Sequence, residues 1–259
     1  MKLVEFSILS LAQAGNILNN ADTFWNNYTP EELAAECAKF PENQRPSPCD
    51  ERGTAFDGQM MMFSSAGQYG CWCDINNGLK RSSNAEPVNS LDYACRDLHH
   101  NYNCIQIDDS SCNPRALDAT KGEYNLPLSA LSPLVSPEDA CASFNIVDSC
   151  AYNTCLVESY FLRETITPVY GGDPIWIEMW DDVNYQHSPI GNFDFNDQCD
   201  VAAFGIAGVG CGPNGCGPAT IAGARTNGKQ CCGQYPAKTA YYPERAQCCE
   251  DVIEPLGTC

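Results

Sequence analysis

Three sets of side chains in this sequence could do chemistry. They are the adjacent histidines His99 and His100, eighteen cysteines, and an uneven excess of carboxylates. An imidazole can act as a general base or bind a metal. Thiols form disulfides or bind zinc, and carboxylate oxygens are ligands that calcium prefers. The spacing within each set indicates which chemistry it favours.

The cysteines favour disulfides over zinc. A reducing cytosol would not tolerate eighteen thiols in 259 residues, so the sequence predicts up to nine disulfides and a secreted, extracellular protein. A zinc site would need repeated CxxC pairs, whereas the close pairs here are CWC at 71–73 and CC at 231–232 and 248–249. The cysteines expected in disulfides are Cys37, Cys49, Cys71, Cys73, Cys95, Cys104, Cys112, Cys141, Cys150, Cys155, Cys199, Cys211, Cys216, Cys231, Cys232, Cys248, Cys249 and Cys259.

The charge balance excludes some partners. With 33 acids against 14 bases the net charge is −19, which repels nucleic acid and anionic lipid and attracts divalent cations. No Lys or Arg lies between Arg163 and Arg225. These carboxylates form either a solvated acidic surface or weak calcium sites, so calcium is the candidate cofactor. The candidate calcium ligands are Asp74, Asp181, Asp182, Asp194 and Asp197.

The amino terminus has two interpretations. Residues 1–14 contain one basic residue, a short apolar run and the small residues Ala12 and Ala14, as in a secretory signal. Glu5 interrupts the run, and the alternative is a retained, packed amphipathic helix. The sequon that begins at Asn27 predicts glycosylation if it is exposed. Elsewhere no apolar stretch approaches the roughly 18 residues of a membrane span, so we expect no transmembrane segment.

Three helices are predicted. The first begins at a capping box formed by Thr29 and Glu32, with Pro30 in its first turn. The second spans about residues 89–104, where apolar residues recur at helical spacing. The third begins near residues 136–139 and either continues or restarts through 150–161. The residues expected to be buried along them are Leu33, Ala34, Cys37, Phe40, Leu91, Ala94, Cys95, Leu98, Tyr102, Cys150, Cys155 and Phe161.

The cysteines also suggest how the chain is divided. Ten lie between residues 37 and 155 and eight between 199 and 259, which predicts two independently stapled modules. The expected parts are a signal-like or retained lead-in (1–34), a disulfide-rich core (35–163), an acidic aromatic connection (164–198) and a cysteine-rich module (199–259). Alternation around Trp176, Glu178 and Trp180 predicts a strand in the connection. The fold class is therefore a small, disulfide-rich α+β fold, with a helical core and a loop- or β-rich C-terminal module.

Residues 69–104 carry a recognisable pattern: YGCWC at 69–73, PVNSLD at 87–92 and CRDLHHNYNC at 95–104. In this order they resemble the calcium loop and catalytic helix of secreted phospholipases A2. In that family, loop carbonyls bind calcium, and the helix supplies a catalytic histidine and a calcium-binding aspartate. The resemblance implies a phospholipase A2-like core, a bridge between Cys73 and Cys95, and pairing of Cys104 with Cys150 or Cys155.

The catalytic positions depart from the family pattern. The sequence DINNG at 74–78 replaces the glycines that follow the loop, and Ala94 replaces the first helix cysteine. His99 stands four residues after Cys95 instead of three, which turns it by about 100° around the helix. His100 occupies the aspartate's place, and an imidazole offers calcium no carboxylate oxygen.

The resemblance makes His99 the candidate base and Asp148 the candidate carboxylate that orients it. In the structural alternative, one imidazole is hydrogen-bonded inside the former active-site cleft and the other is exposed. A metal role for the pair is the third possibility.

The C-terminal run CCGQYP at 231–236, followed by CC at 248–249, is similar to small modules of secreted, matrix-like and adhesive proteins. The function favoured by these patterns is an extracellular structural or assembly protein. It would be a self-associating subunit of a filament, coat or matrix, built on a non-catalytic phospholipase A2-like scaffold and stabilised by calcium. The alternatives are a calcium-dependent secreted phospholipase A2 that hydrolyses glycerophospholipids with His99 as base, and a soluble lipid-binding protein.

Overall fold

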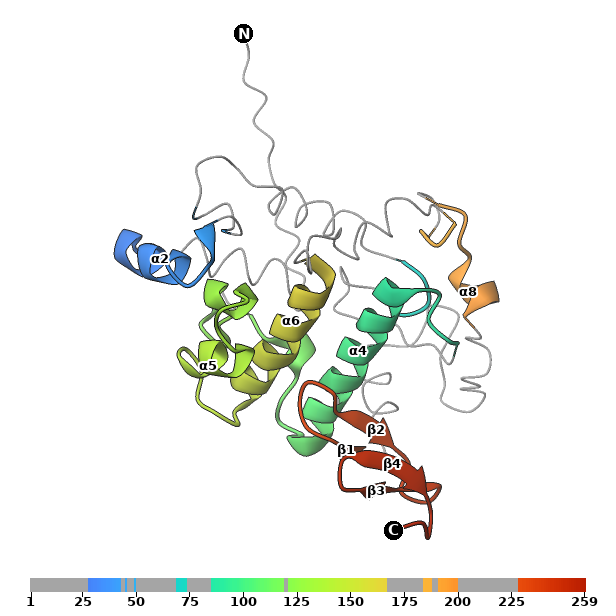
Figure 1. Cartoon of the computed structure of the whole chain (residues 1–259). Helices are drawn as coiled ribbons and strands as arrows, with labels where there is room; N and C mark the ends of the chain where they lie inside the picture. The colour runs from blue at the N-terminus through green and yellow to red at the C-terminus, as the bar shows by residue number, and fades with distance from the viewer. Residues whose placement is uncertain are drawn as a thin grey trace.

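The computed structural model describes residues 28–42, 45, 49, 69–73, 85–118, 121–166, 184–187, 191–199 and 228–259. Its centre is a pair of helices, α4 (Ser90–Asp108) and α6 (Cys150–Ile166), which lie side by side and run in opposite directions (Figure 1). The other elements are α2 (Pro30–Cys37), η4 (Pro114–Ala116), η6 (Leu128–Leu131), α5 (Pro137–Ala142), α8 (Phe195–Gln198), β1 (Gln230–Cys232), β2 (Thr239–Tyr241), β3 (Ala246–Cys249) and β4 (Val252–Pro255).

Local capping starts the helices where the sequence predicts. The Thr29 hydroxyl accepts from the Glu32 amide (3.2 Å) and the Glu32 carboxylate accepts from the Thr29 amide (2.8 Å), so the capping box is confirmed. The side chain of Asn89 caps α4, and that of Ser136 caps α5. The third predicted helix restarts instead of continuing, because α5 ends at Ala142 and α6 begins at Cys150.

The buried faces agree with prediction in α4 and differ in α2. All five α4 residues expected in the core are buried there, and the helix runs four residues past the predicted end. In α2, however, Ala34 is exposed and Glu36 is buried. The Glu36 carboxylate accepts from the Ser129 amide (2.8 Å) and pairs with Lys39 (2.5 Å). A polar anchor to η6 therefore takes the place of an apolar contact.

The C-terminal residues form two antiparallel hairpins. β1 pairs with β2, with Cys231 opposite Ala240, and β3 pairs with β4, with Cys248 opposite Ile253. Two-stranded hairpins are marginal on their own. Here the disulfide Cys232–Cys248 joins the hairpins, and Cys249–Cys259 ties down the chain end. The described C-terminal residues, 228–259, are thus held by disulfides and contain β strands, as expected.

Eight disulfides join all sixteen cysteines among the described residues. Cys73–Cys95 forms as the resemblance implied, but the expectation for Cys104 is wrong, since it pairs with Cys231. The β1–β2 hairpin packs on α4 and brings Cys231 to Cys104. The remaining pairs are Cys37–Cys49, Cys71–Cys199, Cys112–Cys150 and Cys141–Cys155.

Two of these disulfides correct the predicted independence of the cysteine groups. Cys71–Cys199 and Cys104–Cys231 each join the first group to the second. The reason is spatial. β1 and β2 pack directly on α4, which brings Cys231 to Cys104. The Gly70 amide donates to the Tyr185 oxygen (2.8 Å), which ties the region of Cys199 to the loop of Cys71. The proposed domain boundaries stay a prediction. Cys211 and Cys216 lie outside the described residues, as do Asn27, residues 1–14 and the predicted strand around Trp176.

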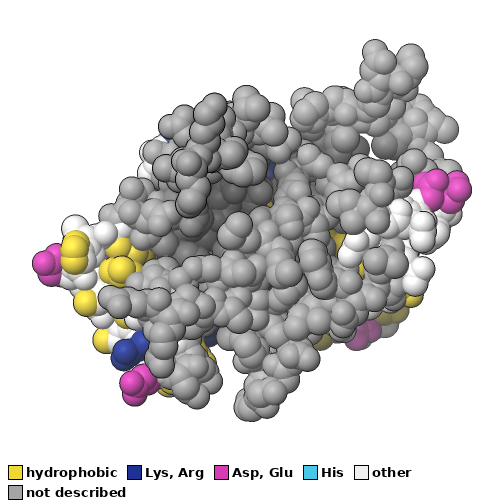
Figure 2. All heavy atoms as spheres, turned by 90° about the horizontal axis from the view of Figure 1, so that it is seen from above, with side chains coloured by type: hydrophobic (Ala, Val, Ile, Leu, Met, Phe, Trp, Pro, Cys, Tyr) yellow, Lys and Arg dark blue, Asp and Glu magenta, His cyan; other side chains and the backbone are white. Residues whose placement is uncertain are grey.

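The described fold is a mixed helix-and-sheet, disulfide-rich fold. Among its helices, none combines the length and apolar character needed to cross a membrane. On the flank where α2 and α5 lie in Figure 1, Figure 2 shows apolar side chains beside acidic and basic ones. The described part of this flank is therefore a mixed surface.

Candidate functional site

The segment that resembles a calcium loop binds a carboxylate of its own chain. Asp92, buried in the first turn of α4, accepts from the amides of Cys71 (3.0 Å), Trp72 (2.7 Å) and Cys73 (3.2 Å), and also from Val88 (3.0 Å). Burial raises the pKa of Asp92, and these backbone donors act against that rise. Four converging N–H groups form an anion-binding nest, and a side chain already fills it.

The carbonyls of the same segment also have protein partners. Tyr69 and Cys73 exchange backbone hydrogen bonds, at 2.9 and 3.2 Å. The Gly70 oxygen lies 2.6 Å from Nε2 of His187. Since a carbonyl can only accept, Nε2 carries the hydrogen. Three of the five backbone carbonyls of residues 69–73 thus accept hydrogen bonds from the protein. The phospholipase A2 resemblance implied that carbonyls of this loop would bind calcium.

Gly70 lets the loop approach α4 closely. It has a φ of +54°, and a Cβ built there would lie 2.5 Å from the carboxyl carbon of Asp92. No larger residue fits that position without displacing the carboxylate. The glycine is therefore required by the contact between loop and helix as well as by its backbone conformation.

His99, the candidate base, is packed inside the protein. Its side chain is buried, and its ring meets Trp72 edge-on, with centroids 5.5 Å apart. Nη2 of Arg115 lies 3.5 Å from His99 Nδ1, and it donates to the His99 backbone oxygen (3.2 Å) and to Asn103 Oδ1 (3.0 Å). A guanidinium has only donors, so Nδ1 faces a cation where a catalytic base would need water or a carboxylate.

His100 packs on the same tryptophan. Its ring lies 5.5 Å from that of Trp72, and Trp72 Nε1 donates to the Ala85 oxygen at 3.0 Å. Burial, together with the charges of Arg96 and Lys229, lowers the pKa of His100 to about 4. The imidazole is therefore neutral near pH 7. The structural alternative expected one of the two imidazoles to be exposed, whereas His99 is buried and His100 is half-buried.

A buried carboxyl that sequence reasoning missed lies between the two long helices. Glu158 of α6 accepts hydrogen bonds from the hydroxyls of Tyr102 and Tyr124. Burial raises the pKa of Glu158 to about 7, although both tyrosines oppose this. Arg115 lies over the Tyr102 ring, 5.1 Å from its centroid, which links this group to His99. Glu158 stands three residues after the buried Cys155, and that helical spacing could have indicated an inward position.

His187 was also missed. It is buried, stacks on Phe193 with ring centroids 5.3 Å apart, and reaches the loop through Gly70. It lies 117 positions from Gly70 in the sequence, so no local pattern could place it there. The disulfide Cys71–Cys199 connects the same two regions.

The remaining predicted site residues are scattered or lie outside the described residues. Asp148 occupies an exposed turn before α6, with a φ of +63°, while His99 is buried in the middle of α4. Asp194 and Asp197 are exposed at and beside α8. Asp74, Asp181 and Asp182 lie outside the described residues. Within the described residues, no three His, Cys, Asp or Glu side chains are grouped as metal ligands would be.

No protein-family model, curated protein or solved structure that was compared with the chain matches it. The phospholipase A2 resemblance therefore stays a prediction that depends on the motif at residues 69–104. The geometry of this centre is that of a packed polar unit, in which loop, histidines and buried acid each contact protein partners.

Proposed function

We propose that this protein is an extracellular structural or assembly protein, a self-associating subunit of a filament, coat or matrix. Its scaffold is non-catalytic and, by resemblance, phospholipase A2-like. The observation that carries the proposal is the packing of Trp72 on both imidazoles, with Arg115 at Nδ1 of His99. In that arrangement the candidate base His99 contacts protein side chains, so it serves packing and not catalysis.

The state of the calcium-loop segment supports the same proposal. A catalytic calcium would bind water and substrate through open coordination positions. In this chain the segment gives its amides to Asp92 and its Gly70 carbonyl to His187. We propose that any calcium this acidic protein binds stabilises contacts between subunits, because it would reduce the repulsion between chains that each carry −19.

The disulfides support the proposed compartment. All sixteen described cysteines are paired, which is typical of proteins that mature in an oxidising environment. A scaffold cross-linked in this way holds its shape outside cells without a large core. That property suits a building block at least as well as an enzyme.

Sedimentation velocity of the native secreted protein tests assembly. We expect fast-sedimenting species at millimolar calcium and fewer of them after chelation. A monomer near 28 kDa in both conditions would exclude the assembly function.

Fatty-acid release from zwitterionic phospholipid vesicles at millimolar calcium tests the phospholipase alternative. We expect no release above background for the wild type and for His99→Gln. Calcium-dependent release by the wild type that His99→Gln abolishes would replace the proposal with the enzymatic function.

A further inference from the structure

The turn between α5 and α6 presents apolar side chains to solvent. Ile146 is 82% exposed and Val147 is 55% exposed. The two are adjacent at the head of a turn that closes through a hydrogen bond from the Ser149 amide to the Ile146 oxygen (3.0 Å). Exposed apolar residues are ordinary when they are scattered, but an adjacent pair at the head of a fixed turn is a candidate contact surface. We call residues 146–148 the apolar turn.

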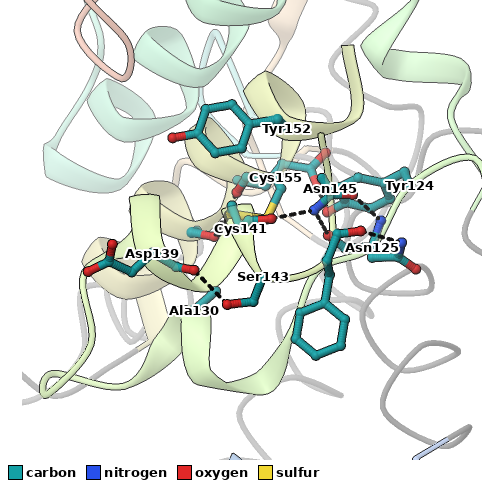
Figure 3. The surroundings of a disulfide bond; sticks show 12 residues. Tyr124, Asn125, Ala130, Asp139, Cys141, Ser143, Asn145, Tyr152 and Cys155 are labelled. Carbon is teal, nitrogen blue, oxygen red and sulfur yellow. Dashed lines mark hydrogen bonds between the residues drawn. A yellow bond between two sulfur atoms is a disulfide. The ribbon is translucent and has the colours of Figure 1, made fainter. Parts of the chain in front are cut away.

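The apolar turn is held rigidly by its neighbours. Asn145 is buried, and its side-chain oxygen accepts from the backbone amide of Asn125 (3.1 Å). Its side-chain nitrogen donates to the backbone oxygens of Asn125 (2.8 Å) and Cys141 (3.1 Å). Figure 3 shows this pair beside the Cys141–Cys155 disulfide. A second disulfide, Cys112–Cys150, follows the turn. A surface fixed in advance loses little conformational entropy when it binds.

The apolar turn and the helix before it carry carboxylates. Asp148 belongs to the apolar turn, and Glu138 and Asp139 lie in the first turn of α5. Glu138 accepts a hydrogen bond from the Tyr160 hydroxyl (2.9 Å). Burial first, and then the charges of Glu138, Asp148 and Asp139, raise the pKa of Tyr152. A partner for this surface must offer an apolar contact flanked by cations.

The loop between β2 and β3, together with Lys229 just before β1, offers that combination on the same chain. Tyr242 is 39% exposed. The Lys229 ammonium lies 5.1 Å from its ring centroid, and the Arg245 guanidinium lies 5.7 Å from it. Arg245 and Glu244 belong to the loop, and Lys229 immediately precedes β1. We call Lys229, Tyr242 and Arg245 the cationic tyrosine patch.

The two surfaces belong to elements that pack on different helices. α5 packs on α6, and the β1–β2 hairpin packs on α4, so that the pair of long helices separates them (Figure 1). Ile146, Val147 and Tyr242 are all exposed, so the apolar turn and the cationic tyrosine patch do not cover each other within one molecule. Contact between them requires two molecules.

We propose that the apolar turn of one molecule docks on the cationic tyrosine patch of a second copy, with Ile146 and Val147 against Tyr242 and the carboxylates against Lys229 and Arg245. The inference rests on the proposed assembly function and specifies its interface. Because the two surfaces differ, the contact is head-to-tail, and its repetition generates an open filament or a closed ring.

Sedimentation velocity of full-length variants at low salt tests the interface. Ile146→Ser/Val147→Ser and Arg245→Glu change exposed side chains only, and each alone is expected to weaken self-association by about tenfold or more. Leu134→Ser, which removes a 65% exposed leucine at the other end of α5, is the matched control and should assemble as the wild type does. Circular dichroism checks that each variant is folded.

An equimolar mixture of the two impaired variants distinguishes this interface from others. Each variant keeps one intact surface, so the mixture should form a 1:1 dimer and stop there. A mixture that stays monomeric, or single variants that assemble like the wild type, would overturn the inference while leaving the assembly function in place. A wild type that is monomeric at every concentration would overturn both.

Discussion

Glu158 is a carboxyl group enclosed on the inner face of α6, where Tyr102 and Tyr124 donate to it. Its pKa is raised from 4.5 to about 7, with burial as the largest cause. The folded state therefore binds the proton more tightly than the unfolded state does. The stability that this proton contributes is fully present below about pH 4.5 and is lost as the pH rises to about 7.

Glu158→Gln should remove this pH dependence. The difference in pKa corresponds to roughly 3 kcal/mol of unfolding free energy. Denaturant unfolding at pH 5 and pH 8 should show the wild type losing stability relative to Glu158→Gln at the higher pH. An equal difference between the two proteins at both pH values would show that Glu158 has an ordinary pKa in the folded state.

At Gly70, the addition of a single Cβ atom should lower the stability of the protein. Gly70→Ala places a Cβ 2.5 Å from the Asp92 carboxyl carbon and also strains a φ of +54°. The expected loss is about 2–4 kcal/mol of unfolding free energy. Gly122→Ala is the matched control, because Gly122 has a φ of +68° with nothing within 4 Å of the added atom.

The control should cost only about 1 kcal/mol. Thermal or denaturant unfolding of both variants gives the comparison. Equal losses would mean that backbone strain alone explains Gly70 and that the carboxylate yields without cost.

At the scale of elements, the β1–β2 hairpin is attached to α4 by several contacts along one helix face. Asn101 Nδ2 donates to the Pro236 oxygen (2.5 Å), Cys104 is bonded to Cys231, and Asp108 accepts from Tyr235 (2.8 Å) and Lys238 (2.5 Å). The α4 residues recur every three or four positions, which is the spacing of one helical face. The hairpin also brings Lys229 near His100.

Cys104→Ser/Cys231→Ser should loosen this attachment and lower the unfolding free energy by about 2–4 kcal/mol. Asp108→Asn should cost less than about 1 kcal/mol of unfolding free energy, because its ion pair with Lys238 is partly exposed.

The Cys104→Ser/Cys231→Ser variant should also raise the pKa of His100 from about 4, since burial and the Lys229 charge both lower that pKa. Proton NMR titration of the histidines measures this, and an unchanged pKa would mean that the hairpin does not cover His100.

At the scale of the whole molecule, the two groups of cysteines form one cross-linked body. Peptide mapping without reduction should recover Cys71–Cys199 and Cys104–Cys231 as linked peptides. Cys73–Cys95 serves as the internal control, because sequence and structure agree on it. Pairs confined within each group would contradict the arrangement of β1 and β2 on α4.

Local features of this protein could be predicted because they depend on neighbours in the chain. The capping box at Thr29 needs only a residue three positions away, and the buried stripe of α4 follows from helical periodicity. The number of cysteines was enough to predict disulfides. The bridge Cys73–Cys95 was implied by the family resemblance, and the structure confirms that pairing.

The candidate site could be predicted only in its location. The sequence by itself determined that loop 69–73 and α4 carry the residues of interest, together with the acidic charge and the cysteines. The tertiary structure alone decided what those residues do. In it, Asp92 accepts hydrogen bonds from the loop amides, Arg115 lies beside Nδ1 of His99, and Glu158 accepts from two tyrosine hydroxyls. Tyr102 and Glu158 are 56 residues apart, and Gly70 and His187 are 117 apart. Contacts at such separations depend on how helices pack and disulfides close, which a chain's local preferences do not specify.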